Sequence, residues 1–423
     1  HFDLRPYGII RMLTVVHVDL QTAGTIILIL SVITGVYGVM LAIVQHNLKR
    51  LLAYHSIENI GIIGIGIGIG VIGMALNRPL LASAGFGGAL LHTLNHSLFK
   101  SLLFFTSGNV YQAIHTVMLE KTGGLIRRMP RTALQFLIAA LAICGLPPFN
   151  GFVSEFLIYS GLYQALGEGR VSTMFMVLSI VALALIGGLA LLCFTKAFGT
   201  VFLGTERLPA AEPVQEASPG KLLPGFIILI PIVAIGTFPA PFLRLLQVPV
   251  GEITGFSQPF VSTGILTMMQ QISLAVWALL LLTGLFWWVR TRVLRPVAPM
   301  SVPTWGCGYT APTPKMQYTA GSFVHTYSRL IGPLVSITRH ERKVADILPG
   351  KASYASHTDD RVELTLIDRP VRAWKSLLGT FRFLQNGRIQ FYVLYGIVFI
   401  AIDITIHLDI REEQYLFQLL NSY

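Results

Sequence analysis

Runs of apolar residues long enough to cross a bilayer dominate this 423-residue chain. A helix needs about 20 such residues to span roughly 30 Å of hydrocarbon. Hydrophobic residues make up 53% of the chain and charged residues only 12%, with a mean hydropathy of +0.66. These values exclude an ordinary soluble domain and predict an all-α polytopic membrane protein. We expect eight spans, at Gly24–Val44, Ile57–Leu76, Leu81–Tyr111, Thr132–Leu166, Ser172–Leu203, Leu222–Leu245, Ile265–Val289 and Phe391–Leu408.

The start of the chain has the character of a cut span. From His1 the sequence leads into YGIIRMLTVV, which is too short to cross the membrane. It carries neither an initiating Met nor the pattern of a signal peptide. We therefore expect that an N-terminal part of the protein precedes His1.

The formal net charge of +11 indicates orientation and not nucleic-acid binding. Basic residues in loops mark the cytoplasmic side of a membrane protein, and no basic stripe is interleaved with aromatic residues. The three cysteines form no metal-like spacing, so we expect no bound cofactor in this chain. The loops that eight spans put on one face carry most of the Lys and Arg, and they include Lys49, Arg50, Lys121, Arg127, Arg128, Arg131, Arg207, Lys221, Arg290, Arg292 and Arg295.

Three ionisable residues lie inside the apolar segment LLHTLNHSLFKSLLFF, which covers residues 90–105. His92, His96 and Lys100 are spaced four apart and therefore share one face of a helix, rising about 6 Å at each step. A lysine at mid-bilayer is costly and usually serves an interior, hydrated function, and histidine exchanges protons near neutral pH. The stripe predicts a proton path, although a lysine that reaches the interface beside two packing histidines remains an alternative.

A second motif, ICGLPPFNGFVSEFLIYSGL, contains Pro147 and Pro148 inside a predicted span. Proline removes a backbone donor and clashes with the preceding turn, so we expect a broken helix at membrane depth. Such breaks are tolerated where they line a cavity. Glu155 lies seven residues after Pro148, where its carboxylate can pair with Lys100 and exchange protons with the histidines. A simple kink with a glutamate near the headgroups is the alternative.

Two further segments carry weaker signals. Lys196 lies toward the cytoplasmic end of its predicted span and is either an entrance group or, slightly favoured, a lysine that snorkels to the interface. His55 and Glu58 follow Lys49 and Arg50 at a helix–helix corner, where a plain positive-inside loop is an equal alternative. Downstream, apolar and basic residues alternate at helical spacing over 362–389, which predicts an interfacial amphipathic helix before the last span.

Several of these segments together resemble one family. The motifs are HNLKRLLAYHSIENIGI, HTLNHSLFKSLLFF, GGLIRRMP, GLPPFNGFVSEFLIY and KAFGTVFLG, in this order. They resemble the antiporter-like subunits shared by respiratory complex I, Mrp cation/proton antiporters and membrane-bound NiFe hydrogenases. The wording AYHSIENIG, with WGCGYTAPTPKMQYTAGSF and LQNGRIQFYVLYGIVF, is most similar to the large antiporter-like subunits of formate-hydrogenlyase and hydrogenase-4-type complexes.

The resemblance implies a fold of two inverted five-helix repeats, each with a broken helix, around a polar proton-conducting axis. Lys100 matches the family's central lysine, His92 and His96 its relay histidines, and Glu155 the acidic form of the broken-helix residue. The implied segments are a remnant at 1–23, the second repeat at 24–203, two additional spans at 204–294, a cytoplasmic segment with the amphipathic helix at 295–390, and a final span and outer tail at 391–423.

The function implied is that of a proton-translocating, non-catalytic subunit of a hydrogenase complex. Protons are expected to pass from the Lys196 region, with His55 as a further member, to Lys100, His96, His92 and then Glu155. Implied partners are other membrane subunits and a peripheral NiFe-hydrogenase or dehydrogenase arm, in a bacterial or archaeal inner membrane. One alternative is a subunit of a Mrp-type antiporter or of a complex I-like NADH:quinone oxidoreductase. Another is a structural anchor with an inactive channel, because the family's lysine just before YGIIR is missing here.

Overall fold

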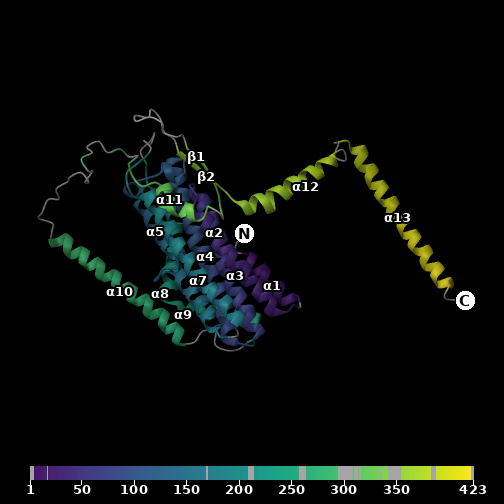
Figure 1. Ribbon diagram of the computed structural model, residues 1–423, viewed down its shortest axis with the longest axis horizontal. Coiled ribbons are helices and arrows are strands. Elements are labelled where there is room, and N and C mark those ends of the chain that lie inside the picture. Colours follow the sequence, from purple (N-terminus) through teal and green to yellow (C-terminus); the bar gives the residue numbers. More distant parts are fainter. Residues whose placement is uncertain are drawn as a thin grey trace. The chain divides into compact units, whose positions relative to one another are not determined.

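The computed structural model describes residues 4–16, 18–167, 170–207, 214–256, 263–293, 308, 313, 316–332, 335–341, 354–382 and 387–420. The chain forms two compact units, His1–Thr358 and Asp359–Tyr423. Helices account for nearly all of the regular structure, as Figure 1 shows. The chain is an all-α polytopic membrane protein, as the sequence predicts.

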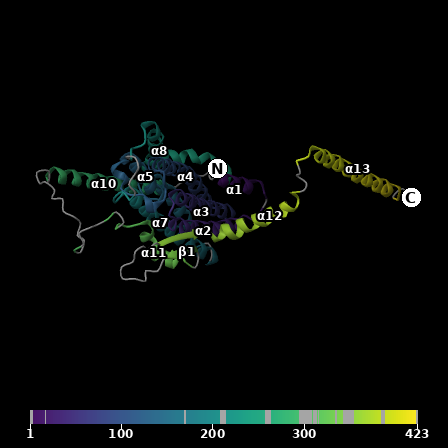
Figure 2. The same ribbon diagram turned by 90° about the horizontal axis from the view of Figure 1, so that it is seen from above.

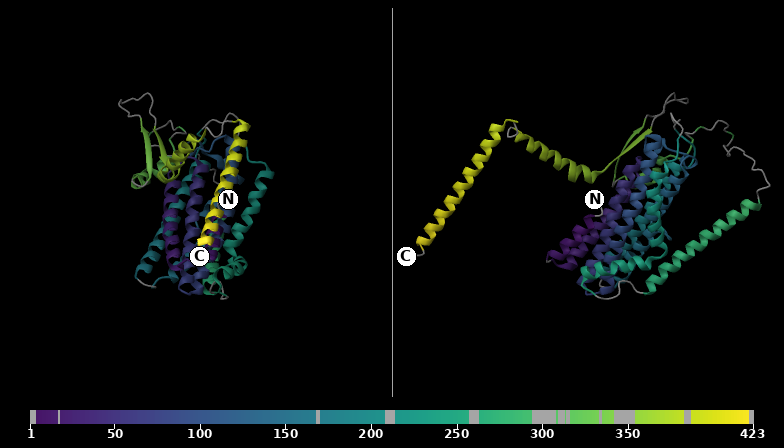
Figure 3. Two further views of the ribbon diagram at one scale, coloured as in Figure 1. Left: turned by 90° about the vertical axis from the view of Figure 1, so that its right-hand side faces the viewer. Right: turned by 180° about the vertical axis from the view of Figure 1, so that it is seen from behind.

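Helices packed side by side make up most of the first unit (Figures 2 and 3). Two short 3-10 turns, η1 (Leu119–Lys121) and η2 (Leu125–Arg127), connect the fourth helix to the fifth. The α-helices of this unit are α1 (Leu4–Val15), α2 (Leu20–Ile43), α3 (Leu48–Ala75), α4 (Pro79–Ile114), α5 (Pro130–Ile143), α6 (Asn150–Gln164), α7 (Arg170–Phe202), α8 (Pro219–Thr237), α9 (Pro239–Thr254), α10 (Thr263–Val293) and α11 (Ala320–Leu330).

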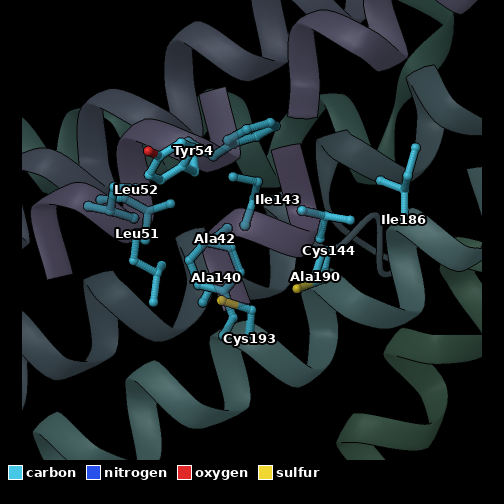
Figure 4. Close-up of a cluster of buried hydrophobic side chains, with 14 of the residues drawn as sticks. Ala42, Leu51, Leu52, Tyr54, Ala140, Ile143, Cys144, Ile186, Ala190 and Cys193 are labelled. Atoms are coloured by element: carbon cyan, nitrogen blue, oxygen red, sulfur yellow. The ribbon is translucent and has the colours of Figure 1, made fainter. Parts of the chain in front are cut away.

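The hydrophobic core lies where α2, α3, α5 and α7 meet. Figure 4 shows part of it, with Ala42, Leu51, Ala140 and Cys193 converging from these four helices. All four side chains are buried. The inward faces of these helices therefore pack against one another. Outward residues such as Leu30 on α2 are exposed, on a surface that lipid or other chains can cover.

The segment IGIGIGIGVIG, which alternates like a strand, is helical and lies in α3, as expected for a glycine-rich helix in lipid. Its glycines let neighbouring helices approach closely. A Cβ atom on Gly61 would lie 2.5 Å from the Cα atom of Gly35 on α2. A Cβ atom on Gly38 of α2 would lie 2.7 Å from the backbone nitrogen of Glu58. The α2–α3 crossing thus depends on the absence of side chains at these positions.

Six helices among the described residues are long and apolar enough to span a membrane, two fewer than the eight predicted. The difference falls on two predicted spans. Leu81–Tyr111 forms a continuous helix, α4, but its polar residues lower its hydropathy, so it is not one of the six. Thr132–Leu166 is divided into the shorter helices α5 and α6, so the predicted break is confirmed.

The predicted span at Leu222–Leu245 is too long, although α8 itself is one of the six apolar helices. The helix α8 ends at Thr237 and α9 begins at Pro239. Proline disfavours the α conformation of the residue before it, and Phe238 has φ −125° and ψ 71°. The prediction joined the two helices because both are apolar. Beyond them, α10 packs against α8 and α9 and is only 6% buried over its most apolar window.

The polar region after α10 contains structure that hydropathy did not indicate. The helix α11 contacts α7 and η1, and two strands, β1 (Ser336–Glu341) and β2 (Tyr354–Asp359), pair with each other. Cys307 and most of PTWGCGYTAPTPKMQYTAGSF lie outside the described residues.

The second unit contains the predicted amphipathic helix in a shorter form. A π-helical turn, η3 (Glu363–Asp368), leads into α12 (Arg369–Thr380), which is followed by α13 (Ile389–Leu420). The helix ends at Thr380 instead of reaching Ile389. Both Trp374 and Leu378 on α12 are exposed within this unit, as an interfacial helix requires.

Replacing Gly61 by Val tests the close crossing of α2 and α3. We expect a loss of stability of about 1–3 kcal/mol, because the added carbons overlap the backbone of Gly35. The measurement is thermal unfolding of the purified chain in detergent. Gly187→Val on α7 is the matched control, since no atom lies within 4 Å of a Cβ there. Equal melting temperatures for the two variants would contradict the role of this crossing.

Candidate functional site

The three ionisable residues of α4 face the interior of the bundle. His92, His96 and Lys100 are all buried, whereas Leu94 and Phe105 on the opposite side of the helix are exposed. The Lys100 side chain is only 5% exposed, and its ammonium nitrogen has no hydrogen-bond partner among the described residues. The stripe predicted from the spacing is therefore an interior feature and not a lysine that snorkels along the surface.

His92 joins three helices through both of its ring nitrogens. Its Nε2 atom lies 3.0 Å from Oδ1 of Asn59 on α3, and its Nδ1 atom lies 2.9 Å from Oγ of Ser154 on α6. The neighbouring Asn95 donates to the carbonyl of Asn150, at 2.7 Å, and to Ser154, at 3.0 Å. These bonds hold α4 against α3 and the first turns of α6.

The partners of Asn59 determine which nitrogen of His92 can exchange a proton. The amide nitrogen of Asn59 donates to the carbonyl of His55 at 2.7 Å, so its Oδ1 atom faces His92 as an acceptor. Nε2 of His92 must then carry a hydrogen in every state. Only Nδ1, which faces the hydroxyl of Ser154, can gain or lose a proton.

The break between α5 and α6 positions Glu155. Gly145 follows α5 with φ +64°, in the left-handed region that favours glycine, and Pro147–Pro148 is the cis bond of the loop. A Cβ atom on Gly145 would overlap the carboxylate of Glu155. Glycine at this position therefore leaves the space that the carboxylate occupies, and Glu155 is held at the gap between the two half-helices.

The predicted pairing of Lys100 with Glu155 is not present in the structure. The Lys100 ammonium makes no hydrogen bond within the described part of the chain, and the acidic side chain whose charge acts on it is Glu58 of α3. The charge of Glu58 also acts on Glu155. The prediction failed because it considered only the two motifs on α4 and α6, whereas α3 packs against both helices.

Glu58 is a residue that sequence reasoning left at a helix–helix corner. The helix α3 begins at Leu48, well before the predicted span, and Asn47 caps it by accepting from the Arg50 amide at 3.1 Å. Glu58 is consequently in the third turn, where it is buried and bonded to Nδ1 of His55. The signal that could have indicated this pair is its three-residue spacing on a helix that continues into the apolar glycine run.

Lys196 is buried and does not snorkel, so the alternative that the sequence slightly favoured is wrong, while its role as an entrance group stays a prediction. Its side chain is 1% exposed, and its ammonium donates to the carbonyls of Ile43 and, at 2.9 Å, Gln45. These carbonyls lie at the C-terminus of α2, where the helix dipole favours a cation. Lys196 therefore fastens the end of α2 to α7.

A second polar contact lies beside the end of α2. One oxygen of Glu120 is 3.3 Å from Nδ1 of His46 and accepts from the Gly321 amide of α11 at 3.0 Å. Burial raises the pKa of Glu120, but these two bonds and the charges of His46 and Arg207 lower it more, so the net shift is downward. The bonds connect η1 to the N-terminus of α11.

Among the described residues, no group of three or more His, Cys, Asp or Glu side chains could hold a metal ion. Instead, the site is a set of buried titratable side chains on helices that cross a membrane.

Residues 3–187 match the family model described as NADH:quinone oxidoreductase/Mrp antiporter, TM. This part of the chain is therefore similar to that antiporter family.

Two relatives in this group come from Escherichia coli (strain K12). The chain is 32% identical over 401 residues to hydrogenase-4 component B, a match that covers 90% of this chain and 58% of that protein. It is 40% identical over 221 residues to formate hydrogenlyase subunit 3, which covers 52% of this chain and 36% of that protein. The chain thus spans less than two thirds of the length of either relative.

A solved structure of similar fold belongs to the membrane-bound sulfane sulfur reductase, an archaeal respiratory membrane complex. Its matching chain has a TM-score of 0.60 and 24% sequence identity, and the match covers 91% of this chain and 56% of that chain. The antiporter-like fold expected from the sequence motifs is thereby confirmed.

Replacing Glu120 by Gln tests the attachment of α11. We expect faster hydrogen–deuterium exchange of the α11 amides, because the charged acceptor of the Gly321 amide is lost. Since the pKa of Glu120 is lowered on folding, its contribution is complete above its unfolded pKa and is lost as pH falls through the folded value.

The control for this prediction is Glu206→Gln, which removes an exposed partner of Arg128 and should leave α11 unchanged. Exchange in α11 that is the same in the wild-type chain and in the Glu120 variant would contradict the attachment.

Proposed function

We propose that this chain is the proton-translocating membrane subunit of a membrane-bound hydrogenase complex of the formate-hydrogenlyase or hydrogenase-4 type. It couples redox chemistry in partner subunits to proton movement. The observation that carries the proposal is the interior row of His92, His96 and Lys100, which lies within the residues that match the antiporter family model. The similarity to hydrogenase-4 component B and formate hydrogenlyase subunit 3 supports the hydrogenase assignment.

The proposed path follows the buried side chains. Protons enter near Lys196, reach Lys100 with His55 as a further member, and continue along His96 and His92 to Glu155. Histidine and lysine side chains four residues apart on α4 lie about 6 Å from one another, so water molecules complete the path. Glu155 at the helix break then passes protons outward.

The proposed partners are other membrane subunits and a peripheral NiFe-hydrogenase or dehydrogenase arm, in the cytoplasmic membrane of a bacterium or archaeon. This chain contributes the proton path, and the partners carry the redox centres. The exposed apolar surfaces of α10 support a place among other membrane subunits, because lipid or neighbouring helices must cover them. Purification through a tag on this chain tests the assignment, which requires a hydrogenase-like subunit in the complex.

A cation/proton antiporter is the second candidate function, because the matching family model includes Mrp antiporters. It requires no redox partner. Sodium-dependent proton exchange by an assembly of membrane subunits alone would favour it over the hydrogenase complex.

Replacing Lys100 by Ala tests the proton path. We expect proton pumping to be abolished while the complex still assembles, because the central ionisable group is removed from an otherwise complete helix. Pumping is measured with a pH-sensitive dye in vesicles that contain the whole complex. Thr106→Ala is the matched control, since this buried hydroxyl on α4 bonds only to the carbonyls of Leu102 and Leu103. Unchanged pumping in the Lys100 variant would reject the path.

A further inference from the structure

Glu58 is as deeply buried as any charged residue in the bundle. Its side chain is 1% exposed, and α2 crosses so closely that Gly38 lies against the backbone of Glu58. Because Gly38 has no side chain, α2 offers Glu58 no countercharge at this contact. An isolated carboxylate in such a place is strongly disfavoured unless it is paired or protonated.

Two titratable side chains provide the charge balance for Glu58. His55, one turn earlier on α3, is hydrogen-bonded through Nδ1 to the Glu58 carboxylate. Lys100 on α4 is the cation whose charge interacts with Glu58. Both neighbours are themselves buried, and α3 packs along α4, so the three groups lie in one enclosed part of the bundle without a direct ion pair between Lys100 and Glu58 among the described residues.

The cluster has hydrogen-bonding capacity that the protein does not use. Nε2 of His55 and the ammonium nitrogen of Lys100 are both buried without a hydrogen-bond partner of normal geometry among the described residues, and the thiol of Cys193 lies near His55. His92 is different, because Asn59 and Ser154 occupy both of its nitrogens. Proton exchange through this part of the bundle is therefore easier at the cluster than at His92, where existing bonds must break first.

We propose that His55, Glu58 and Lys100 form a cluster that holds one exchangeable proton, with Glu58 as the shared countercharge. The proposal rests on the proposed function and extends it by adding a residue and a route. One proton resides on Glu58, on His55 as the imidazolium that is bonded to the carboxylate, or on Lys100 as the ammonium whose charge acts on the carboxylate. The net charge of the cluster is zero in all three states.

The proton step within the cluster is balanced. A water molecule next to Nε2 of His55 accepts the proton from the imidazolium, and the same water passes a proton to the neutral amine of Lys100. One N–H bond breaks at His55, one forms at Lys100, and the carboxylate of Glu58 remains ionised. Because no net charge is created in the interior, the transfer avoids the large desolvation penalty of an unbalanced ion.

This arrangement assigns Glu58 the role of a positioning residue that acts through its two neighbours. Proton flow from the side of Lys196 then reaches Lys100 along α3. His92 lies beyond Lys100 on the same path, and it is bonded to Asn59, four residues after His55. The proposed route therefore runs from α3 through Lys100 and the histidines of α4 to the helix break.

Replacing Glu58 by Gln in the whole complex tests the cluster. Gln keeps the size of the side chain and a hydrogen bond to His55 but removes the charge. We expect pumping in vesicles to fall at least about tenfold, because the unbalanced charge raises the free-energy barrier to proton transfer. Glu58→Asp keeps the carboxyl group and should restore most of the rate. The matched control is Ser56→Ala, which changes a buried α3 residue whose hydroxyl faces only the carbonyl of Leu52.

The outcomes separate this proposal from the proposed function. Normal pumping in Glu58→Gln together with lost pumping in Lys100→Ala overturns the cluster and leaves the function standing. Normal pumping in both variants overturns the function itself. Equal losses in Glu58→Gln and Glu58→Asp also overturn the cluster, since the effect then follows shape and not charge.

A double variant keeps the test decisive if Glu58→Gln does not assemble. Adding Lys100→Met removes the cation that Glu58 balances, so assembly should return to the wild-type yield. Continued failure of the double variant to assemble would overturn the idea that charge balance links these two residues.

Discussion

Polar groups between the helices must find partners inside the protein, because lipid offers none. This constraint explains why the interior is built as it is. The loop that breaks α5 from α6 exposes backbone groups at membrane depth, and α8 covers it where Gly236 lies directly against Pro148 and Phe149. The amide and hydroxyl side chains around Asn95 satisfy the first turn of α6 in the same way. A break of this kind is possible only within such a packed setting.

The same constraint separates two kinds of buried polar residue. His92 and Asn95 both bond to Ser154 and use their remaining polar atoms on Asn59 and Asn150, and these bonds hold three helices together. His55 and Lys100 retain unused capacity at one nitrogen each. The first group forms a rigid frame, and the second is where exchangeable hydrogen can be accommodated. Both groups are needed, because proton transfer depends on donors and acceptors that are held in place.

Sequence reasoning was most successful where one helix alone determines the outcome. The four-residue spacing on α4 predicted an interior stripe, and the two prolines predicted the break before α6, since both follow from the geometry of a single segment. Two predicted spans are not among the six long apolar helices, because polar residues lower the hydropathy of α4 and a break divides the other span into α5 and α6. The helices α8 and α9 were merged because apolar length alone does not detect the turn at Phe238.

The residues that were misplaced depend on contacts between segments distant in the chain. Lys196 lies more than 150 residues from the carbonyls that it binds, and nothing in its local sequence distinguishes that position from a membrane surface. The acidic side chain whose charge acts on Lys100 is Glu58 on α3, although the acidic residue of the α6 motif was the more conspicuous candidate. The paired strands β1 and β2 are short and polar, so no hydrophobic pattern marked them.

The contact between Lys196 and the end of α2 has a mechanical consequence. Its grip on the carbonyls of Ile43 and Gln45 depends on a charged nitrogen, because an uncharged amine is a weaker donor and does not oppose the helix dipole. When this nitrogen loses its proton, the hydrogen bonds that join α7 to the end of α2 become weaker. The charge on this one nitrogen therefore influences how firmly α2 and α7 are held together. The chain continues from α2 through Asn47 to α3, the helix that carries His55 and Glu58.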